Sequence, residues 1–350
     1  MSHANQAATS AEQVSAAGAP IAPLDAAGKR SRPSLRKIIM FGSFLLMLVI
    51  FTLAKPDTFW SGQNLANVIN ALPILAMLAI GVTVVLILGE FDLSVPYVAA
   101  LTTVTVAVAS TQTGMPFVLV LVIGLALATL IGSVNGAAVG YGKAPAFVVT
   151  LAVGSMAAGI ELFVQSKIDL GRTSVNVTSL SEPLQNLSLN HWIAFGDFQL
   201  EIATLLLVIV AVVVGIVMTL TPWGRHVTAI GGNEIAARLA GVPVRRTKVL
   251  AFTLTGLLAG FAGILFAGRA GYFNNALPAF LLPAYAAAFF GAAGVGKRGF
   301  SVPATMFGAV YLAVLSNGLT ILNVPTWVGT GVQGVVLFAA VLLARSKGRA

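Results

Sequence analysis

Residues 224–248, GRHVTAIGGNEIAARLAGVPVRRTK, form the longest polar and charged stretch that lies between two strongly apolar segments of this chain. Within it, residues 233–240 are good helix formers, framed by the helix breakers at 231–232 and 241–243. A glycine directly after a helix and an acidic residue in its first turn, here Glu234, are typical helix-end signals. We therefore predict a short amphipathic helix between two membrane spans, a handle by which a protein outside the bilayer can move helices inside it.

The composition predicts a membrane protein. Hydrophobic residues make up 57% of the chain and charged residues 9%, and the mean hydropathy is +0.94, whereas about a quarter of the residues of a soluble domain are charged. A bilayer core about 30 Å thick needs roughly 20 apolar residues per helix. We therefore expect an all-α polytopic membrane protein of about ten transmembrane helices, the fifth and eighth of them short. The predicted spans are residues 38–54, 68–88, 93–110, 117–139, 145–160, 202–220, 249–267, 280–295, 302–322 and 327–344.

The positions of lysine and arginine predict the orientation, because these residues are retained on the cytoplasmic side. With both termini cytoplasmic, 16 of the 20 basic residues fall inside, and only Lys55, Lys167, Arg172 and Arg269 fall outside. The inverted orientation contradicts this bias. The net charge of +9 then reflects topology and contact with anionic membrane lipid, and no nucleic-acid partner is needed to explain it.

The chain divides into a membrane domain and two tails. Residues 1–37 are predicted to be a disordered basic cytoplasmic tail, residues 38–344 the membrane domain, and residues 345–350 a second basic cytoplasmic tail. A basic cluster before an apolar run also describes a signal peptide, but no convincing small-residue cleavage site follows the run. Within the membrane domain, residues 224–248 are the cytoplasmic segment, and residues 165–200 form the longest external loop, whose length favours a function in binding an external protein.

Carboxylates and amides near the apolar segments are candidates for a polar path. Glu90 and Asp92 lie between the second and third spans, where charge is costly unless the residues sit in an interfacial loop or a functional break. Asp92 is interpreted mainly as a cap for the third span, with a direct role in the path as the alternative. Asn135 and Thr150 can bond neighbouring helices or line a polar path, and for Asn135 the first role is favoured. Glu161 completes the set of candidate buried carboxylates, none with an obvious basic partner in the membrane.

Several other functions are disfavoured. Residues 291–297, GAAGVGK, fit most of a phosphate-binding loop, but Arg298 follows where a hydroxyl is needed and no strand precedes it. The chain has no cysteine, which excludes disulfides and thiolate metal sites, and His191 has no partner spaced for metal binding. No catalytic residue and no metal site is predicted.

At four places the sequence resembles the membrane permeases of bacterial ATP-binding-cassette (ABC) importers, in the branch that serves ribose, xylose, galactose and similar monosaccharides. Residues 229–241, AIGGNEIAARLAG, match without a gap the family segment that enters a cleft of the partner ATPase. Residues 89–96, GEFDLSVP, are similar to a second motif, but Glu90 and Pro96 stand where glycine is usual. Residues 132–151, GSVNGAAVGYGKAPAFVVTL, and 308–319, GAVYLAVLSNGL, resemble the other two. The resemblance runs from about residue 64 to the end of the chain.

This resemblance implies a permease in the bacterial plasma (inner) membrane that pairs with a second permease, as a homodimer or heterodimer. It also implies a cytoplasmic ABC ATPase and an external or periplasmic binding protein as partners. No cofactor is expected on this chain, since ATP and Mg would be bound by the partner ATPase. The implied ATPase-coupling residues are Gly231, Gly232, Asn233, Glu234, Ala237, Arg238 and Gly241. The implied substrate path is lined by Asp92, Ser94, Asn135, Phe147, Thr150 and Asn317.

Three alternatives remain open at this point. The same architecture could import a branched-chain amino acid, an autoinducer or a nucleoside. An ion-driven secondary transporter also has broken helices and polar groups near the middle of the membrane. A membrane-embedded enzyme is disfavoured, because no cluster of His, Cys or carboxylate residues is present.

Overall fold

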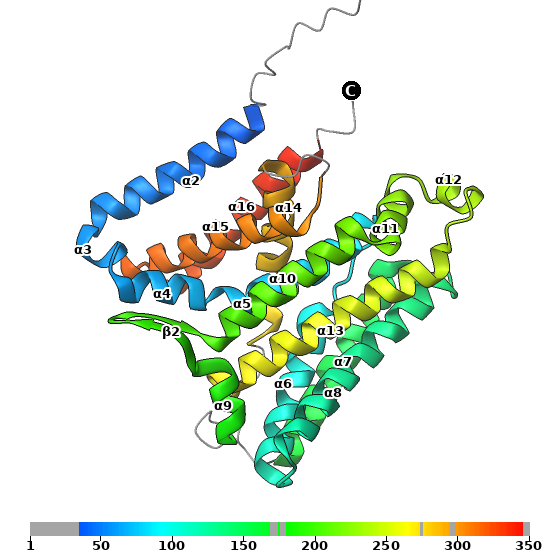
Figure 1. Cartoon of the computed structure of the whole chain (residues 1–350), viewed down its shortest axis with the longest axis horizontal. Helices are drawn as coiled ribbons and strands as arrows, with labels where there is room; N and C mark the ends of the chain where they lie inside the picture. The colour runs from blue at the N-terminus through cyan, green and yellow to red at the C-terminus, as the bar shows by residue number, and fades with distance from the viewer. Residues whose placement is uncertain (1–34, 169–173, 176–179, 274–275, 295–298, 346–350) are drawn as a thin grey trace, which may run out of the picture. The chain divides into compact units, whose positions relative to one another are not determined.

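A computed structural model describes residues 35–168, 174–175, 180–273, 276–294 and 299–345 of the chain (Figure 1). Most of these residues are helical, and eight helices are long and apolar enough to cross a membrane. Two further apolar helices, Val95–Thr111 and Pro278–Gly294, are shorter. Together these ten segments coincide with the ten predicted spans, so the all-α polytopic fold is confirmed. Of the predicted tails at 1–37 and 345–350, residues 1–34 and 346–350 lie outside the described part of the chain. Residues 35–37 begin the first described helix and residue 345 ends the last one, so the prediction of tail at these four residues is wrong.

The element bounds refine the prediction. The helices are α2 (Leu35–Ala54), α3 (Pro56–Phe59), α4 (Gly62–Asn70), α5 (Leu72–Ile87), α6 (Val95–Gln112), α7 (Phe117–Gly140), α8 (Ala146–Ile168), α9 (Glu182–Leu189), α10 (Ile202–Leu220), α11 (Pro222–Gly232), α12 (Glu234–Leu239), α13 (Val244–Ala270), the short 3-10 helix η2 (Pro278–Phe280), α14 (Leu281–Gly294), α15 (Val302–Ile321) and α16 (Thr326–Arg345). The strands are β1 (Ser174–Val175), β2 (His191–Phe195), β3 (Phe198–Glu201) and β4 (Tyr272–Phe273).

Two expectations about these elements are corrected. The fifth span is not short, because α8 continues past residue 160 to Ile168 and leaves the segment 165–200 shorter than expected. That segment is also not a plain loop. It contains α9 and the antiparallel β2–β3 hairpin, and β1 pairs with β4, which follows α13.

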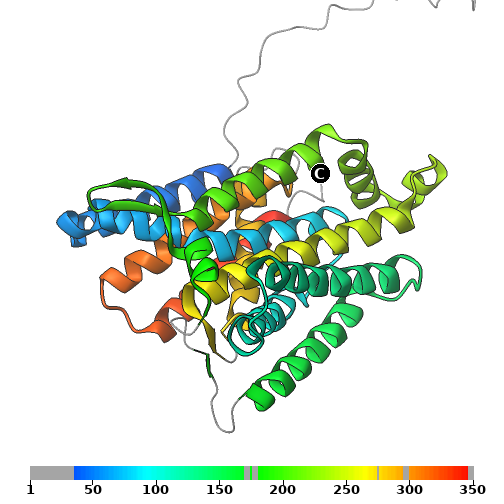
Figure 2. The same ribbon diagram turned by 60° about the horizontal axis from the view of Figure 1, so that its bottom comes forward.

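Helix α13 forms the centre of the described fold, where it packs against α5, α6 and α7 (Figures 1 and 2). Its contact with α7 is backbone to backbone. A Cβ atom built on Gly256 would lie 2.4 Å from the carbonyl oxygen of Ala128, and one on Gly132 would lie 2.4 Å from that of Phe252. Small residues on both helices therefore permit this close approach.

Helix α5 is surrounded by other helices. All of its residues except Ile87 are buried, which accounts for its apolar sequence on every side, since a helix without an exposed face needs no polar stripe. Its neighbours include α13, α14, α15 and α10. Helix α2 instead packs by one face, where Phe41 and Phe44 contact the ring of Phe307 and Met40 lies against Gly294. Most of its other large side chains are exposed, as a lipid-facing surface requires.

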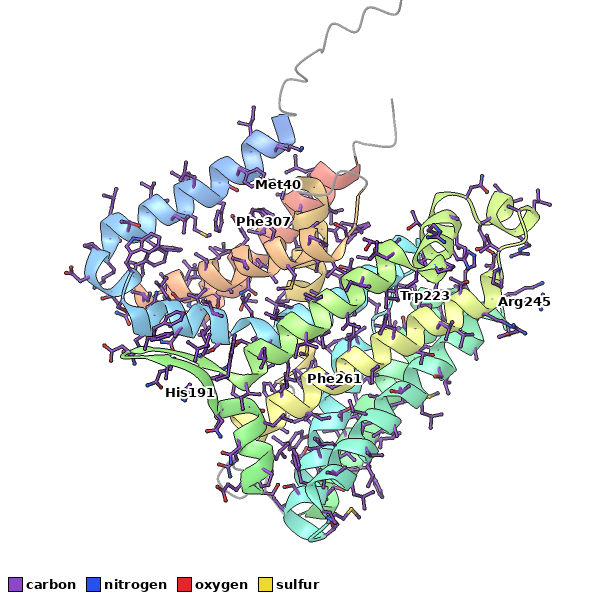
Figure 3. The ribbon with its side chains drawn as sticks, in the orientation of Figure 1. Met40, His191, Trp223, Arg245, Phe261 and Phe307 are labelled. Carbon is purple, nitrogen blue, oxygen red and sulfur yellow. The ribbon has the colours of Figure 1, made fainter. Side chains whose placement is uncertain are left out.

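The two ends of the α13 bundle differ, and we name them by what they carry. The α12 end holds α11, α12 and the beginning of α13, and Arg245 lies there (Figure 3). The β2–β3 end holds the hairpin and the end of α13, and His191 lies there (Figure 3). At the β2–β3 end, Arg269 of α13 forms an ion pair with Glu201 at 2.6 Å and donates to the carbonyl of Asn70. This contact fixes α4, the hairpin and α13 together.

Candidate functional site

Helix α12 is capped by hydrogen bonds at both ends. Asn233 precedes it, and its Oδ1 atom accepts a hydrogen bond from the Ala236 amide at 2.9 Å. At the other end, Gly241 has a φ of +83° and its amide donates to the Arg238 carbonyl, while the Val242 amide donates to the Ala237 carbonyl. This pair of bonds is the Schellman motif, which favours glycine at the left-handed position. The predicted helix at 233–240 is therefore confirmed, with Asn233 as its cap.

The glycine pair before α12 marks the end of a helix, as predicted, but it forms no separate turn. Gly231 and Gly232 are the last two residues of α11, and only Asn233 separates α11 from α12. A Cβ atom on Gly231 would lie 1.7 Å from the carbonyl oxygen of Ile87, whereas one on Gly232 would meet nothing within 4 Å. Gly231 is thus required by its contact with the end of α5, a constraint that the local sequence does not contain.

Helix α12 presents two large apolar side chains outward. The exposed fractions of Ile235 and Leu239 are 74% and 84%, while Ala237 between them is buried. Residues four apart lie on one face of a helix, and the helix projects from the bundle beyond α11 and α13 (Figures 1 and 2). Exposed apolar pairs of this kind mark contact surfaces for other proteins. The sequence analysis predicted no role for Ile235 or Leu239, although their i,i+4 spacing in a charged segment is a visible signal.

A shared lysine connects α12 to the rest of the structure. Lys248 Nζ lies 2.9 Å from Glu234 Oε2 and 2.6 Å from Glu90 Oε1, and Arg238 also pairs with Glu234. The hydrogen bond from Lys248 holds the pKa of Glu234 below its ordinary value, and Arg238 adds to this effect. Glu90 therefore has a basic partner, contrary to the expectation from the sequence, and it lies in the segment between α5 and α6.

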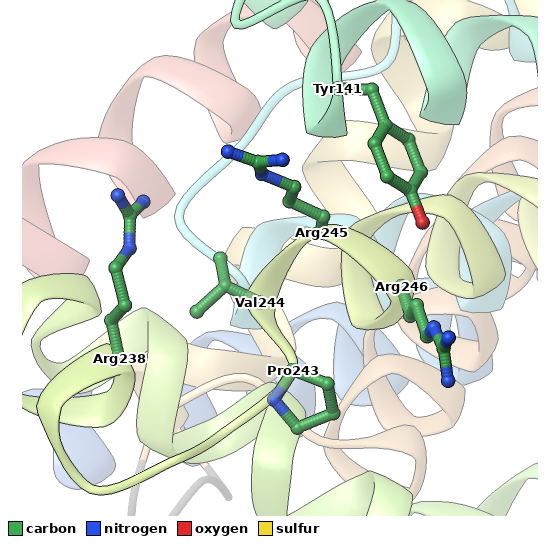
Figure 4. Close-up of a pocket in the computed structure, with 6 residues that line it drawn as sticks. All are labelled: Tyr141, Arg238, Pro243, Val244, Arg245 and Arg246. Carbon is green, nitrogen blue, oxygen red and sulfur yellow. The ribbon is translucent and has the colours of Figure 1, made fainter.

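Two cavities lined by basic residues lie at the α12 end, and Lys248 lines the second of them. The first, of about 400 Å³, is lined by Tyr141, Pro243, Val244 and three arginines, Arg238, Arg245 and Arg246 (Figure 4). The guanidinium of Arg245 lies 6.0 Å from the centre of the Tyr141 ring, within the range of a cation–π contact. The second cavity, of about 380 Å³, is lined by both carboxylates of the Lys248 cluster and by the following basic residues: Lys143, Arg238, Arg245 and Lys248.

Four of the six predicted path residues lie together in one buried hydrogen-bonded cluster. Asp92 Oδ1 accepts from the amide and the hydroxyl of Ser94, at 2.9 and 2.6 Å. The Ser94 hydroxyl in turn accepts from Asn135 of α7, at 2.8 Å. Thr150 of α8 accepts from the Leu93 amide at 3.1 Å. The Asp92 side chain thus closes a turn immediately before α6, but the residue that precedes this helix is Ser94, and no side chain caps the helix, so the expected cap at Asp92 is wrong. The path role of these residues remains a prediction.

Tyr285 of α14 is the member of this cluster that the sequence did not reveal. Its hydroxyl lies 3.0 Å from both the amide and the carbonyl of Asp92. A tyrosine in an apolar helix carries no signal of its own, so the contact became visible only in the folded chain. With it, the segment between α5 and α6 is bound to side chains of α7, α8 and α14.

The other two predicted path residues lie elsewhere. Phe147 is on α8, 55% exposed. Asn317 of α15 donates to Asn64 of α4 at 2.9 Å, and it borders a third cavity, of about 440 Å³, near the β2–β3 end. The polar lining residues of this cavity are Asn67, Ser316, Asn317, Thr320 and Gln333.

Comparison with known proteins identifies the family. A family model described as the permease component of a branched-chain amino acid transport system matches residues 64–341. The chain belongs to this permease family. The ribose import permease protein of Bacillus subtilis is 30% identical to this permease over 322 residues, which cover 89% of the chain and 94% of that relative.

Two further relatives give the same result. The ribose import permease protein of Escherichia coli is 30% identical over 312 residues, covering 87% of this permease and 92% of the relative. The xylose transport system permease protein of the same species is 27% identical over 359 residues, covering 88% and 91%. No solved structure gives a significant match to the permease. The matched region includes α12, Lys248 and the Asp92 cluster.

Proposed function

We propose that this protein is the membrane subunit of an ABC importer, a multi-pass inner-membrane protein that moves a monosaccharide or related polyol. The partner ATPase supplies ATP hydrolysis and binds ATP and Mg, a binding protein delivers the sugar from outside, and a second permease completes the path. The chain is similar to ribose and xylose permeases over most of their length, and this similarity supports the proposal.

The observation that carries the proposal is the exposed pair Ile235 and Leu239 on α12. Outside a bilayer, an apolar pair on a helix fixed at both ends is a surface for a protein partner, since it would otherwise remain in water. The α12 end is the basic end, as expected for the cytoplasmic side, and the partner at that side is the ATPase. In this proposal α12 enters a cleft of the ATPase with Ile235 and Leu239 at the centre, and Arg238 at the rim.

The cavity near the β2–β3 end favours an uncharged cargo. Its polar lining consists of amides and hydroxyls, and none of the described residues that line it is ionisable. Such groups suit the hydroxyls of a sugar, which both donate and accept hydrogen bonds. An amino acid would bring an ammonium and a carboxylate, and burying them without countercharges is costly.

A branched-chain amino acid is the second candidate cargo, and the description of the matching family favours it. The two cargoes are separated by uptake into proteoliposomes that contain the permease, the ATPase and the binding protein. We expect ATP-dependent uptake of a labelled pentose or hexose, and none of labelled leucine. Leucine uptake would reverse the choice of cargo, and uptake without the ATPase would contradict the ABC assignment in favour of ion-driven transport.

The same preparation tests the role of the α12 segment. We expect Glu234→Arg to abolish uptake, because it removes the acceptor of Lys248 and Arg238 and places a third cation beside them. Gly232→Pro should do the same by removing an amide at the junction of α11 and α12. Both variants must retain the elution profile of the native protein, and unchanged uptake in both would contradict the placement of coupling in this segment.

A further inference from the structure

Lys248 joins three segments of the chain, one of which lies far from the other two in sequence. Glu234 begins α12, Lys248 lies near the start of α13, and Glu90 lies between α5 and α6. The ammonium contacts both carboxylates, at 2.6 Å for Glu90 and 2.9 Å for Glu234. The projecting helix is therefore tied through one side chain to the connection between two membrane spans.

The connection that contains Glu90 is itself bound to the helices around it. Asp92, two residues further on, lies in the buried cluster with Tyr285 of α14, and the adjacent Leu93 amide donates to Thr150 of α8. Direct contacts thus run from α12 through Lys248 and Glu90 to the beginning of α6. Such contiguous contacts between stiff elements are a route for energetic coupling between distant sites.

Burial and charge make this contact consequential. The Lys248 side chain is 11% exposed and that of Glu90 23%, and partly buried charges interact more strongly than charges in water. Removal of one partner leaves the other charge partly buried without compensation. Lys143 and Arg245 line the same cavity of about 380 Å³ as these two carboxylates. Either cation can therefore pair with a carboxylate if α12 moves and the Lys248 contacts change.

We propose that Lys248, held between Glu90 and Glu234, is the positioning residue that transmits movement of α12 to the segment between α5 and α6. This inference rests on the proposed function, since it takes α12 as the site where the ATPase acts. Loss of the Lys248 contacts uncouples the membrane spans from the ATPase while leaving the two proteins bound to each other. Lys248 touches no substrate, and it acts through Glu90 on the helices of the Asp92 cluster.

The test needs no knowledge of the cargo. The chain has no cysteine, so Ser316→Cys, an exposed position that lines the cavity near the β2–β3 end, places a single thiol in the permease. The rate at which a maleimide alkylates this thiol, with and without ATP, reports whether ATP binding changes that end of the molecule. The full complex with the ATPase is used, and the affinity of the ATPase for each permease variant is measured in parallel.

Four variants in the Ser316→Cys background are compared with the Ser316→Cys reference. We expect Lys248→Met to reduce the ATP-dependent change in alkylation rate about fivefold or more while the affinity for the ATPase stays unchanged. Lys248→Arg, which keeps the charge and can contact both carboxylates, restores the response. Glu90→Gln keeps a neutral acceptor, and we expect its response to lie between those of Lys248→Met and Lys248→Arg. Glu201→Gln, which removes an ion pair of the same length at the opposite end, is the matched control and responds as the reference does.

The outcomes separate the inference from the proposed function. A full response in Lys248→Met overturns the inference and leaves the proposed function standing. Parallel loss of response and of ATPase affinity also overturns it, because Lys248 would then only hold α12 in place for docking. A Ser316→Cys reference that binds the ATPase but does not respond to ATP contradicts the proposed function itself, and the inference falls with it.

Discussion

Helix α13 carries a paired cation at each end, and the two pairs differ in their surroundings. Arg269 pairs with Glu201 at the β2–β3 end. There Asn70 also hydrogen-bonds to the backbone of Gln199 and Glu201, and its own carbonyl accepts a hydrogen bond from Arg269. Lys248 pairs with Glu90 and Glu234 at the α12 end. The exposed apolar pair of α12 and two cavities lined by further basic side chains lie at the same end. The first arrangement is closed upon itself, as suits an anchor. The second is open toward a partner, as suits a contact that must transmit movement.

The largest effect is expected at the contact that supports the α12 end. Gly231→Ala would place a Cβ atom 1.7 Å from the Ile87 carbonyl oxygen, so α11 must shift, and we expect the free energy of unfolding to fall by about 1–3 kcal/mol. Gly232→Ala meets open space and is expected to change stability in the opposite direction, by up to about 1 kcal/mol, since alanine favours a helix more than glycine does. Thermal unfolding in detergent measures both, and equal effects would contradict the close approach of α11 and α5.

The next effect concerns the anchor at the β2–β3 end. The side-chain amide of Asn70 donates through Nδ2 to the backbone carbonyl of Gln199 at 2.9 Å and accepts at Oδ1 from the backbone amide of Glu201 at 3.0 Å. Asn70→Ala leaves both groups without this partner, and we expect the opening free energy of the β2–β3 hairpin to fall by about 1–3 kcal/mol. Hydrogen exchange of residues 191–201 measures the change, and Asn67→Ala on the same helix is the control.

This variant also sharpens the comparison between the two ends. If the β2–β3 end is an anchor only, Asn70→Ala leaves the affinity for the ATPase unchanged. A loss of that affinity would show that the two ends are not separable, and that the distinction between anchor and docking site is wrong.

The smallest effect is the dependence of α12 on pH. The hydrogen bond from Lys248 lowers the pKa of Glu234, so the bound carboxylate stabilises α12 fully above the ordinary glutamate pKa of about 4.3. This contribution is lost as the pH falls through the lowered pKa of the folded protein. We therefore expect amide protection in α12 to be flat at neutral pH and to fall only below about pH 4. Glu234→Gln should remove the dependence, and a fall near neutral pH would be inconsistent with the lowered pKa.

The features that sequence reasoning predicted are those that local signals determine. Long apolar runs placed the ten spans, and Glu234 with the glycine at residue 241 placed α12, because each signal lies within or beside its own helix. Residues 231–232 show the limit of such signals. Local propensity correctly marks a helix end at these glycines, but it does not reveal that Gly231 approaches Ile87, about 140 residues away in the chain.

The site itself was predicted in part. Asp92, Asn135 and Thr150 were selected as polar residues in an apolar chain and Ser94 through the family resemblance, and the four lie together. Neither the Glu90–Lys248 pair nor Tyr285 could be selected in that way, because each depends on helices brought together by packing. The i,i+4 spacing of Ile235 and Leu239 is visible in the sequence, but only the folded chain shows that both side chains are exposed.

The affinity of the permease for the ATPase, measured with Leu239→Asp, tests the central claim most directly. If α12 is the docking element, a carboxylate at this exposed apolar position weakens binding by about 30-fold or more, as expected for a residue at the centre of an interface. Phe195→Asp, which changes an equally exposed apolar side chain in β2 at the opposite end, leaves binding as in the native protein. Native affinity in Leu239→Asp, with the protein folded, would contradict the assignment of α12 as the site where the ATPase binds.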